Sequence, residues 1–163
     1  MSKSSATLIE APAAVEPGPA DIFFQRADAL FRTAVECCRQ HERYARLVDI
    51  GALDAEQKAA QQAVCAADAT LAEMTAGYEK AASRTHPEGH ECWHKANLLW
   101  HASREFARRS RSCDLGSRRM GERDDHSTAR LGELTLDYDL YASALLALRH
   151  ATESYKKARP IAV

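Results

Sequence analysis

The stretch from Asp21 to Val48, DIFFQRADALFRTAVECCRQHERYARLV, decides the fold class of this 163-residue chain. Apolar or small residues recur along it at alternating steps of three and four, which is the spacing of one face of a long α-helix. We call such a series a seam. This one consists of Phe24, Ala27, Phe31, Ala34, Cys38, His41, Ala45 and Val48. It predicts a single long helix with a histidine on its buried face.

Three further segments repeat this spacing, so the pattern extends over most of the chain. Their seams are Ala60, Val64, Ala67, Leu71, Met74, Tyr78 and Ala81, then Cys92, Ala96, Leu99, Ser103, Phe106, Ser110 and Cys113, and finally Leu131, Leu134, Tyr138, Tyr141, Leu145, Leu148, Thr152 and Tyr155. Between the first two segments, Asp54 with Gln57 approximates a capping box after Gly51. Gly116 and Gly121 predict a longer polar connection before the last segment.

The composition agrees with an all-helical chain. Ala occurs 31 times and Leu 15 times, whereas Val and Ile together occur 9 times, which leaves little material for a buried sheet. We therefore predict an all-α antiparallel four-helix bundle with long helices over residues 21–159. A disordered N-terminal arm at 1–20 and a short tail at 160–163 flank it. The structural alternative is a helical hairpin pair that completes its core by dimerising.

Charge and cysteine content restrict the class of function. The net charge is −1, so the chain as a whole carries no bias toward nucleic acid or an anionic membrane. The sequence contains neither an apolar run of membrane-spanning length nor a secretory leader, and we expect a cytoplasmic protein. Its five cysteines, an odd number without regular spacing, are expected to be reduced thiols.

One histidine lies on a seam, and it is a candidate metal ligand. His41 follows Cys37 and Cys38 by one turn, so a thiolate and an imidazole can point into the same layer. Zinc or copper would accept Cys38 and His41 if another helix supplied more ligands, for which Cys65 is one candidate. The alternative is a core histidine that is hydrogen-bonded to a carbonyl or a tyrosine, with no cofactor.

The third segment carries a second set of histidines on its polar side. His90 and His94 lie one turn apart and could bind zinc or copper at a surface or an oligomer contact. A plain solvated face is the alternative. HECW at His90–Trp93, then His94 before Lys95, and CDLG at Cys113–Gly116 resemble parts of the chemoreceptor zinc-binding domain, a helical bundle. The resemblance covers under a quarter of the chain, and it implies a zinc site there. The downstream histidine pair of that family is missing.

Two further groups could bind partners. The first is an arginine cluster able to hold anions through forked hydrogen bonds, namely Arg108, Arg109, Arg111, Arg118 and Arg119. The alternative is pairing with acidic residues of the last helix. The second is Trp93 with Trp100, whose exposed edges would anchor a protein partner.

No catalytic constellation accompanies these groups. The chain lacks a Gly-x-Ser-x-Gly turn, a glycine-rich phosphate loop and the glutamate set of di-iron bundles. We therefore expect a protein that is not an enzyme, namely a helical scaffold or adaptor that self-associates or binds a protein partner through its helix surfaces. A metal-binding bundle and an anion or nucleic-acid binder are the alternatives, although we expect no nucleic-acid partner.

Overall fold

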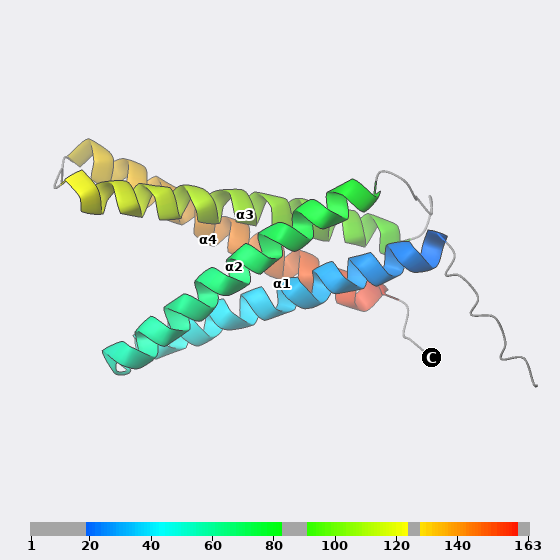
Figure 1. Ribbon diagram of the computed structural model, residues 1–163, viewed down its shortest axis with the longest axis horizontal. Helices are drawn as coiled ribbons and strands as arrows, with labels where there is room; N and C mark the ends of the chain where they lie inside the picture. Colours follow the sequence, from blue (N-terminus) through cyan, green and yellow to red (C-terminus); the bar gives the residue numbers. More distant parts are fainter. Residues whose placement is uncertain (1–18, 83–90, 124–127, 160–163) are drawn as a thin grey trace, which may run out of the picture.

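A computed structural model describes residues 19–82, 91–123 and 128–159, with side chains at 22–79, 91–113 and 132–159. These residues form four helices, α1 (Pro19–Asp49), α2 (Asp54–Ala82), α3 (Glu91–Arg123) and α4 (Thr128–Ala158) (Figure 1). The predicted tail at 160–163 and all but the last two residues of the predicted arm lie outside the described residues. Over the described helices, no segment combines the length and apolarity of a membrane span.

The four helices form an antiparallel bundle, as the seams predict. Consecutive helices run in opposite directions, and the hairpins α1–α2 and α3–α4 hold the most extensive packing (Figure 1). α2 also packs on α3 and α1 on α4, whereas α1 and α3 barely touch. This is the neighbour pattern of an up-down-up-down bundle with short connections.

Backbone hydrogen bonds fix the turn between α1 and α2. Gly51 adopts a left-handed conformation with φ of 63°. Its N–H donates to the Val48 carbonyl at 3.1 Å, and the Ala52 N–H donates to the Leu47 carbonyl at 3.0 Å. This pair of bonds is a Schellman motif, which satisfies the last carbonyls of α1. The side-chain amide of Gln57 donates to the Ala52 carbonyl at 2.8 Å, whereas in a capping box its side-chain oxygen would accept from the Asp54 N–H.

The core lies along the bundle axis and is mostly aliphatic and aromatic. Each helix contributes one leucine with no exposed surface, and these are Leu30, Leu71, Leu99 and Leu148. Burying each of them contributes about 1.5–3 kcal/mol. Alanines at buried seam positions such as Ala27 and Ala96 allow the helix backbones to approach closely.

The most buried face of α1 is displaced by one residue from the predicted seam. Ala27, Ala34 and His41 belong to both, but the fully buried positions between them are Leu30 and Cys37. Two residue series with steps of three and four can start from the same residue, one taking the step of three first and the other the step of four. They lie next to each other on the helix surface. The sequence alone therefore did not distinguish Cys37 from Cys38 as the more central residue.

At the end of the bundle that holds the α1–α2 turn, residues on the predicted seams do not pack against the opposite hairpin. Ala45, Val48 and Tyr138, all predicted to be buried, are exposed, and Val48 and Tyr138 keep 45% and 49% of their surface. The reason is visible in Figure 1, where hairpin α1–α2 diverges from hairpin α3–α4 toward their turns. We call this open end the fork. The prediction of one continuous seam per helix is wrong there.

The predicted polar connection after Gly116 is also wrong in part. α3 continues through Gly116 and Gly121 to Arg123. Each glycine costs a helix about 1 kcal/mol relative to alanine, which favourable neighbours can offset. Arg118, Arg119 and Met120 between them are good helix formers, so the helix extends across both glycines.

Candidate metal centre

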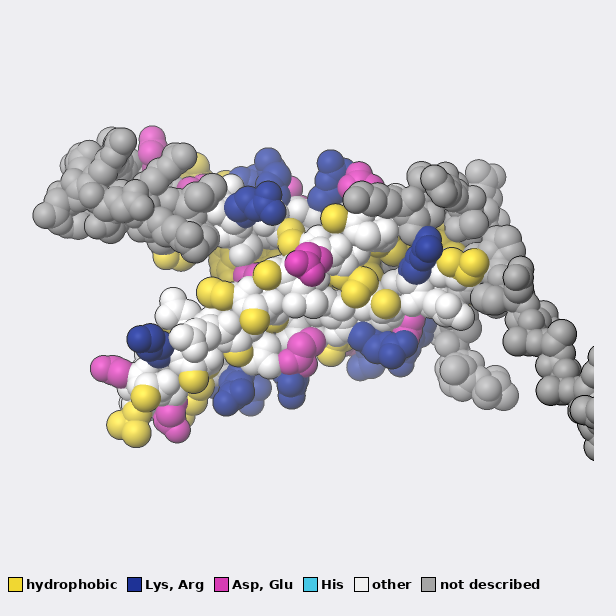
Figure 2. All heavy atoms as spheres, in the orientation of Figure 1, with side chains coloured by type: hydrophobic (Ala, Val, Ile, Leu, Met, Phe, Trp, Pro, Cys, Tyr) yellow, Lys and Arg dark blue, Asp and Glu magenta, His cyan; other side chains and the backbone are white. Residues whose placement is uncertain are grey.

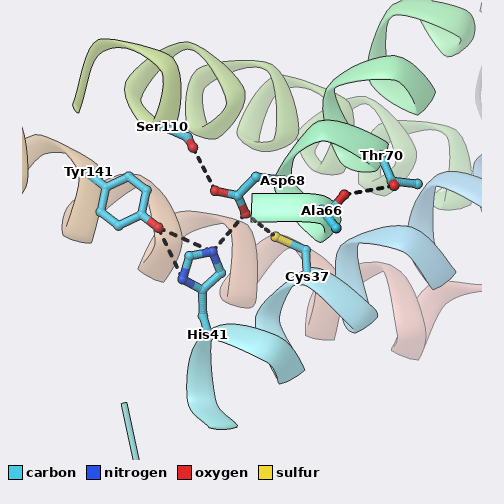
Figure 3. Close-up of polar contacts among 7 residues, drawn as sticks. All are labelled: Cys37, His41, Ala66, Asp68, Thr70, Ser110 and Tyr141. Atoms are coloured by element: carbon cyan, nitrogen blue, oxygen red, sulfur yellow. Dashed lines mark hydrogen bonds and ion pairs between the residues drawn. The ribbon is translucent and has the colours of Figure 1, made fainter. Parts of the chain in front are cut away.

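A polar cluster that draws on all four helices occupies the core just before the fork (Figure 3). Cys37 and His41 come from α1, where a spacing of four residues places both side chains on one face. Asp68 reaches them from α2, while Ser110 of α3 and Tyr141 of α4 approach from the other hairpin. Every element of the fold thus contributes to this one layer.

The Asp68 carboxylate is the centre of the cluster. Its Oδ1 lies 2.8 Å from His41 Nε2 and accepts a hydrogen bond from Cys37 Sγ at 3.4 Å. Its Oδ2 accepts a hydrogen bond from Ser110 Oγ at 2.7 Å. Asp68 therefore binds side chains of α1 and α3 at once, and it links the two hairpins.

His41 is enclosed as tightly as the carboxylate. It is 7% exposed, and the Phe106 ring meets it edge to face at 5.5 Å between centroids. The Tyr141 hydroxyl lies 3.1 Å from Nδ1 and 3.2 Å from Nε2, so it can bond only one nitrogen at a time. All groups are satisfied when Nε2–H donates to Asp68 and Tyr141 donates to Nδ1.

The surroundings disfavour free anions on the neighbouring groups. Burial, and then the charge of Asp68, raise the pKa of the Cys37 thiol far above its ordinary range. The same two causes raise the pKa of Tyr141. No described Lys or Arg pairs with Asp68, and among the described side chains His41 would balance its charge only when the imidazole is protonated.

Three of these residues lie close enough to share one metal ion. Ligand atoms of Cys37, His41 and Asp68 all lie within 4.8 Å of one another, which no other trio of potential ligands among the described side chains achieves. Zinc–ligand bonds of about 2.0–2.3 Å place ligand atoms roughly 3–4 Å apart. The spacing of the trio, up to 4.8 Å, is somewhat wider than this range.

The order of contacts differs from that of a nucleophilic triad. In such a triad the histidine lies between the nucleophile and the acid and removes the proton of the nucleophile. Here Asp68 lies between Cys37 and His41, and the thiol donates to the carboxylate. The arrangement holds the thiol proton instead of activating the sulfur.

The other predicted ligands lie elsewhere. Cys38 is buried but is not in the trio, and burial raises its pKa to about 11 against the opposing charge of Arg149. Cys65 and His94 are exposed, and His90 lies outside the described residues. Of the predicted ligands only His41 belongs to the close trio, where it lies beside Cys37 and Asp68.

The predicted partner-binding residues have mixed surroundings. Trp93 and Trp100 are half-buried and pack against the core, with the Arg104 guanidinium 5.5 Å from the Trp100 ring centroid. In the arginine cluster, Arg108 and Arg109 both donate to Glu105 at 2.8 Å.

Of the other three arginines predicted for this cluster, only Arg111 has a described side chain. Arg111 is exposed, while the side chains of Arg118 and Arg119 lie outside the described part.

Comparison with known proteins adds no assignment to this geometry. No protein-family model, no curated protein and no solved structure matches the chain.

Proposed function

We propose that the protein is a metal-binding helical bundle that holds one zinc ion through Cys37, His41 and Asp68. The observation that supports this proposal is the convergence of a thiol, an imidazole and a carboxylate within 4.8 Å in a buried layer. Buried groups of this kind require either complete mutual hydrogen bonding or a cation. A divalent ion would complement the two negative charges that these ligands acquire when the thiol loses its proton.

The ligand chemistry favours zinc over copper. Thiolate with imidazole suits both metals, but the carboxylate of Asp68 is a hard ligand, which Cu(I) does not prefer. Zinc accepts all three ligand types with tetrahedral geometry and leaves a fourth position for water or another group. We therefore assign zinc.

The remaining two residues of the cluster would orient the ligands. Ser110 holds Oδ2 of Asp68, which leaves Oδ1 to face Cys37 and His41. When Nε2 of His41 is the ligand nitrogen, the ring proton lies on Nδ1, and Nδ1–H can donate to the Tyr141 hydroxyl 3.1 Å away. Such hydrogen bonds to ligands commonly change metal affinity 10–100-fold, so about that effect is expected here.

The proposal predicts that affinity depends on pH. The raised pKa of Cys37 keeps its thiol protonated in the metal-free protein, so binding must release that proton. Between mildly acidic and neutral pH, each proton released on binding should therefore make the apparent affinity rise about tenfold per pH unit. Competition with a chelator of known affinity measures this dependence.

A cobalt titration of the untagged protein tests the proposal. We expect one equivalent of Co²⁺ to give the near-ultraviolet charge-transfer band of a cobalt–thiolate bond. The Cys37→Ser variant should lose the band, whereas the matched Cys38→Ser variant should keep it. A band that survives in Cys37→Ser, or the absence of a stoichiometric band in the wild-type protein, would contradict the assignment.

The fork supports a second candidate function, a self-associating scaffold. Val48 and Tyr138 lie on apolar seams but remain exposed where the hairpins diverge. Ile50 and Leu53, in the turn that follows Val48, are 75% and 74% exposed. Exposed apolar surface of this kind is typical of interaction sites. We propose that a second copy of the chain covers it, because two forks facing each other would continue both sets of seams.

Sedimentation velocity tests this association. We expect a dimer for the wild-type protein and a shift toward monomer in Val48→Asp. Val35→Asp is the matched control, because Val35 is 40% exposed on the same helix but lies off the seam. A wild-type monomer at all concentrations, or equal loss in both variants, would contradict association through the fork. Trp93 and Trp100 remain proposed anchors for a different partner, tested by alanine variants in the same assay.

A further inference from the structure

The outer face of α1 carries a row of arginines that is independent of the metal centre. Arg39, Arg43 and Arg46 follow one another at steps of four and three, so they lie on one side of the helix within about 10 Å. Together with Gln40 and Leu47 they line a surface groove of about 330 Å³. In Figure 2, basic side chains gather along the lower edge of the molecule, where α1 runs.

Two of the three guanidinium groups have no acidic partner in the described chain. The Arg39 guanidinium already donates two hydrogen bonds to the Glu36 carboxylate, at 2.9 and 2.8 Å. Arg46 donates only to the backbone carbonyl of Glu42, and neither Arg43 nor Arg46 forms an ion pair with a described acidic side chain. The contrast with α3 is direct, since Glu105 occupies both Arg108 and Arg109 there.

We propose that this groove, the α1 arginine groove, binds an acidic helical segment of a partner protein. The Arg39–Glu36 pair shows how a carboxylate binds a guanidinium on this face. Carboxylates on a partner helix at the same steps of four and three would meet Arg43 and Arg46 in the same way. The aliphatic stems of the arginines and Leu47 would receive the methylene groups of the partner's glutamates.

The surrounding charges favour a protein over a nucleic acid or a membrane. Glu36 and Glu42 flank the row on α1, where they lie against Arg39 and Arg149. They interrupt the positive charge of this face, so it suits a uniform polyanion such as RNA or an anionic lipid surface poorly. A protein helix can place carboxylates opposite the arginines and neutral or basic residues opposite the glutamates. The row is also short, which fits two turns of helix better than an extended phosphate backbone.

Fluorescence anisotropy with two labelled helical peptides tests the proposal on the full chain. One peptide carries glutamates at steps of four and three, and the other carries glutamines there. We expect the glutamate peptide to bind, with affinity that falls as salt rises, and the glutamine peptide to bind at least about tenfold more weakly. The double variant Arg43→Glu/Arg46→Glu should weaken binding of the glutamate peptide by at least about tenfold.

The matched control is Arg26→Glu/Lys157→Glu, which makes the same charge change at two exposed basic residues outside both the groove and the predicted arginine cluster. We expect it to stay within about twofold of wild type, with circular dichroism confirming that both variants fold. Equal losses in the two double variants, no peptide binding, or preferential binding of single-stranded RNA or anionic vesicles would each overturn the proposal. Metal content does not enter these measurements, so they are independent of the zinc proposal.

Discussion

The core contains two kinds of buried polar group, and they are satisfied in different ways. Thr75, Ser103 and Thr152 each donate to the carbonyl four residues earlier in their own helix, at 2.6, 2.8 and 2.7 Å. In the candidate metal centre, by contrast, Asp68 and His41 bond to side chains of other helices. Groups of the first kind need no partner from another helix, whereas the hydrogen bonds of the second kind form only when the four helices are assembled.

This difference separates polar groups that the core tolerates from polar groups that can bind something. A hydroxyl bonded within its own helix is screened by its own backbone and offers no converging lone pairs. A cluster of carboxylate, thiol and imidazole lone pairs is costly to bury unless each one is satisfied, and it fits a metal ion when its atoms converge.

The largest effect should follow from removing the charge at the centre of the cluster. Asp68→Asn keeps the shape of the side chain but loses the anionic ligand. We expect zinc affinity to fall by more than about 100-fold, because loss of a ligand should exceed the effect of an orienting residue. Isothermal titration or chelator competition measures the change. Affinity within a few-fold of wild type would remove Asp68 from the site.

An intermediate effect should follow from changing a residue that orients a ligand. Ser110→Ala removes the hydrogen bond to Asp68 Oδ2 but leaves all three ligands in place, and zinc affinity should fall about 10–100-fold. Ser112→Ala is the control, because Ser112 on the same helix donates to the Arg108 carbonyl at 3.2 Å. Indistinguishable affinities for the two variants would show that Ser110 does not orient the carboxylate.

A small effect should follow from the locally satisfied kind of polar group. Thr75→Val removes one hydroxyl whose acceptor, the Leu71 carbonyl, belongs to the same helix. We expect the free energy of unfolding to change by less than about 1 kcal/mol and zinc affinity to stay unchanged. Urea denaturation followed by circular dichroism measures the first quantity. A loss of zinc affinity here would erase the distinction between the two kinds of group.

The smallest effect should come from a charged cluster that is not buried. Hydrogen bonds from Arg108 and then Arg109 lower the pKa of Glu105 to about 2, although its side chain is 45% exposed. Because the pKa is lower in the folded state, this stabilisation is present at neutral pH and disappears as pH falls from about 4.5 toward 2. Glu105→Gln should lower the free energy of unfolding by less than about 1 kcal/mol at pH 7, because solvent screens the pair. It should not change that free energy below about pH 2, where Glu105 is protonated.

Most of the fold followed from the seams, but the centre of the cluster did not. The seam assigned to the second helix passed through Ala67 and Met74, which are half-buried. An equally regular series of Val64, Asp68, Leu71, Thr75 and Tyr78 is the more buried one, apart from the 13% exposed carboxyl side chain of Asp68. Choosing apolar residues at ambiguous positions therefore excluded Asp68. A second reading that admits polar residues at steps of four and three would have found it.

The fork could not be predicted from periodicity, because a seam shows which face is apolar and not where its partner departs. Ala45 and Val48 continue the spacing of α1 without interruption, yet the helices opposite them have already diverged. His41, in contrast, was predictable as a core histidine, since it lies on both possible seams of its helix. Its bond to Tyr141 was one of the alternatives that the sequence left open.

Native mass spectrometry of the untagged protein, with zinc supplied in slight excess, shows whether Cys37, His41 and Asp68 hold the ion. We expect a mass increase of one zinc per chain that a chelator removes and that Asp68→Asn does not show. A wild-type chain that stays metal-free, or an Asp68→Asn chain that retains the ion, would contradict it. In that case the cluster would be a hydrogen-bonded layer that joins the two hairpins.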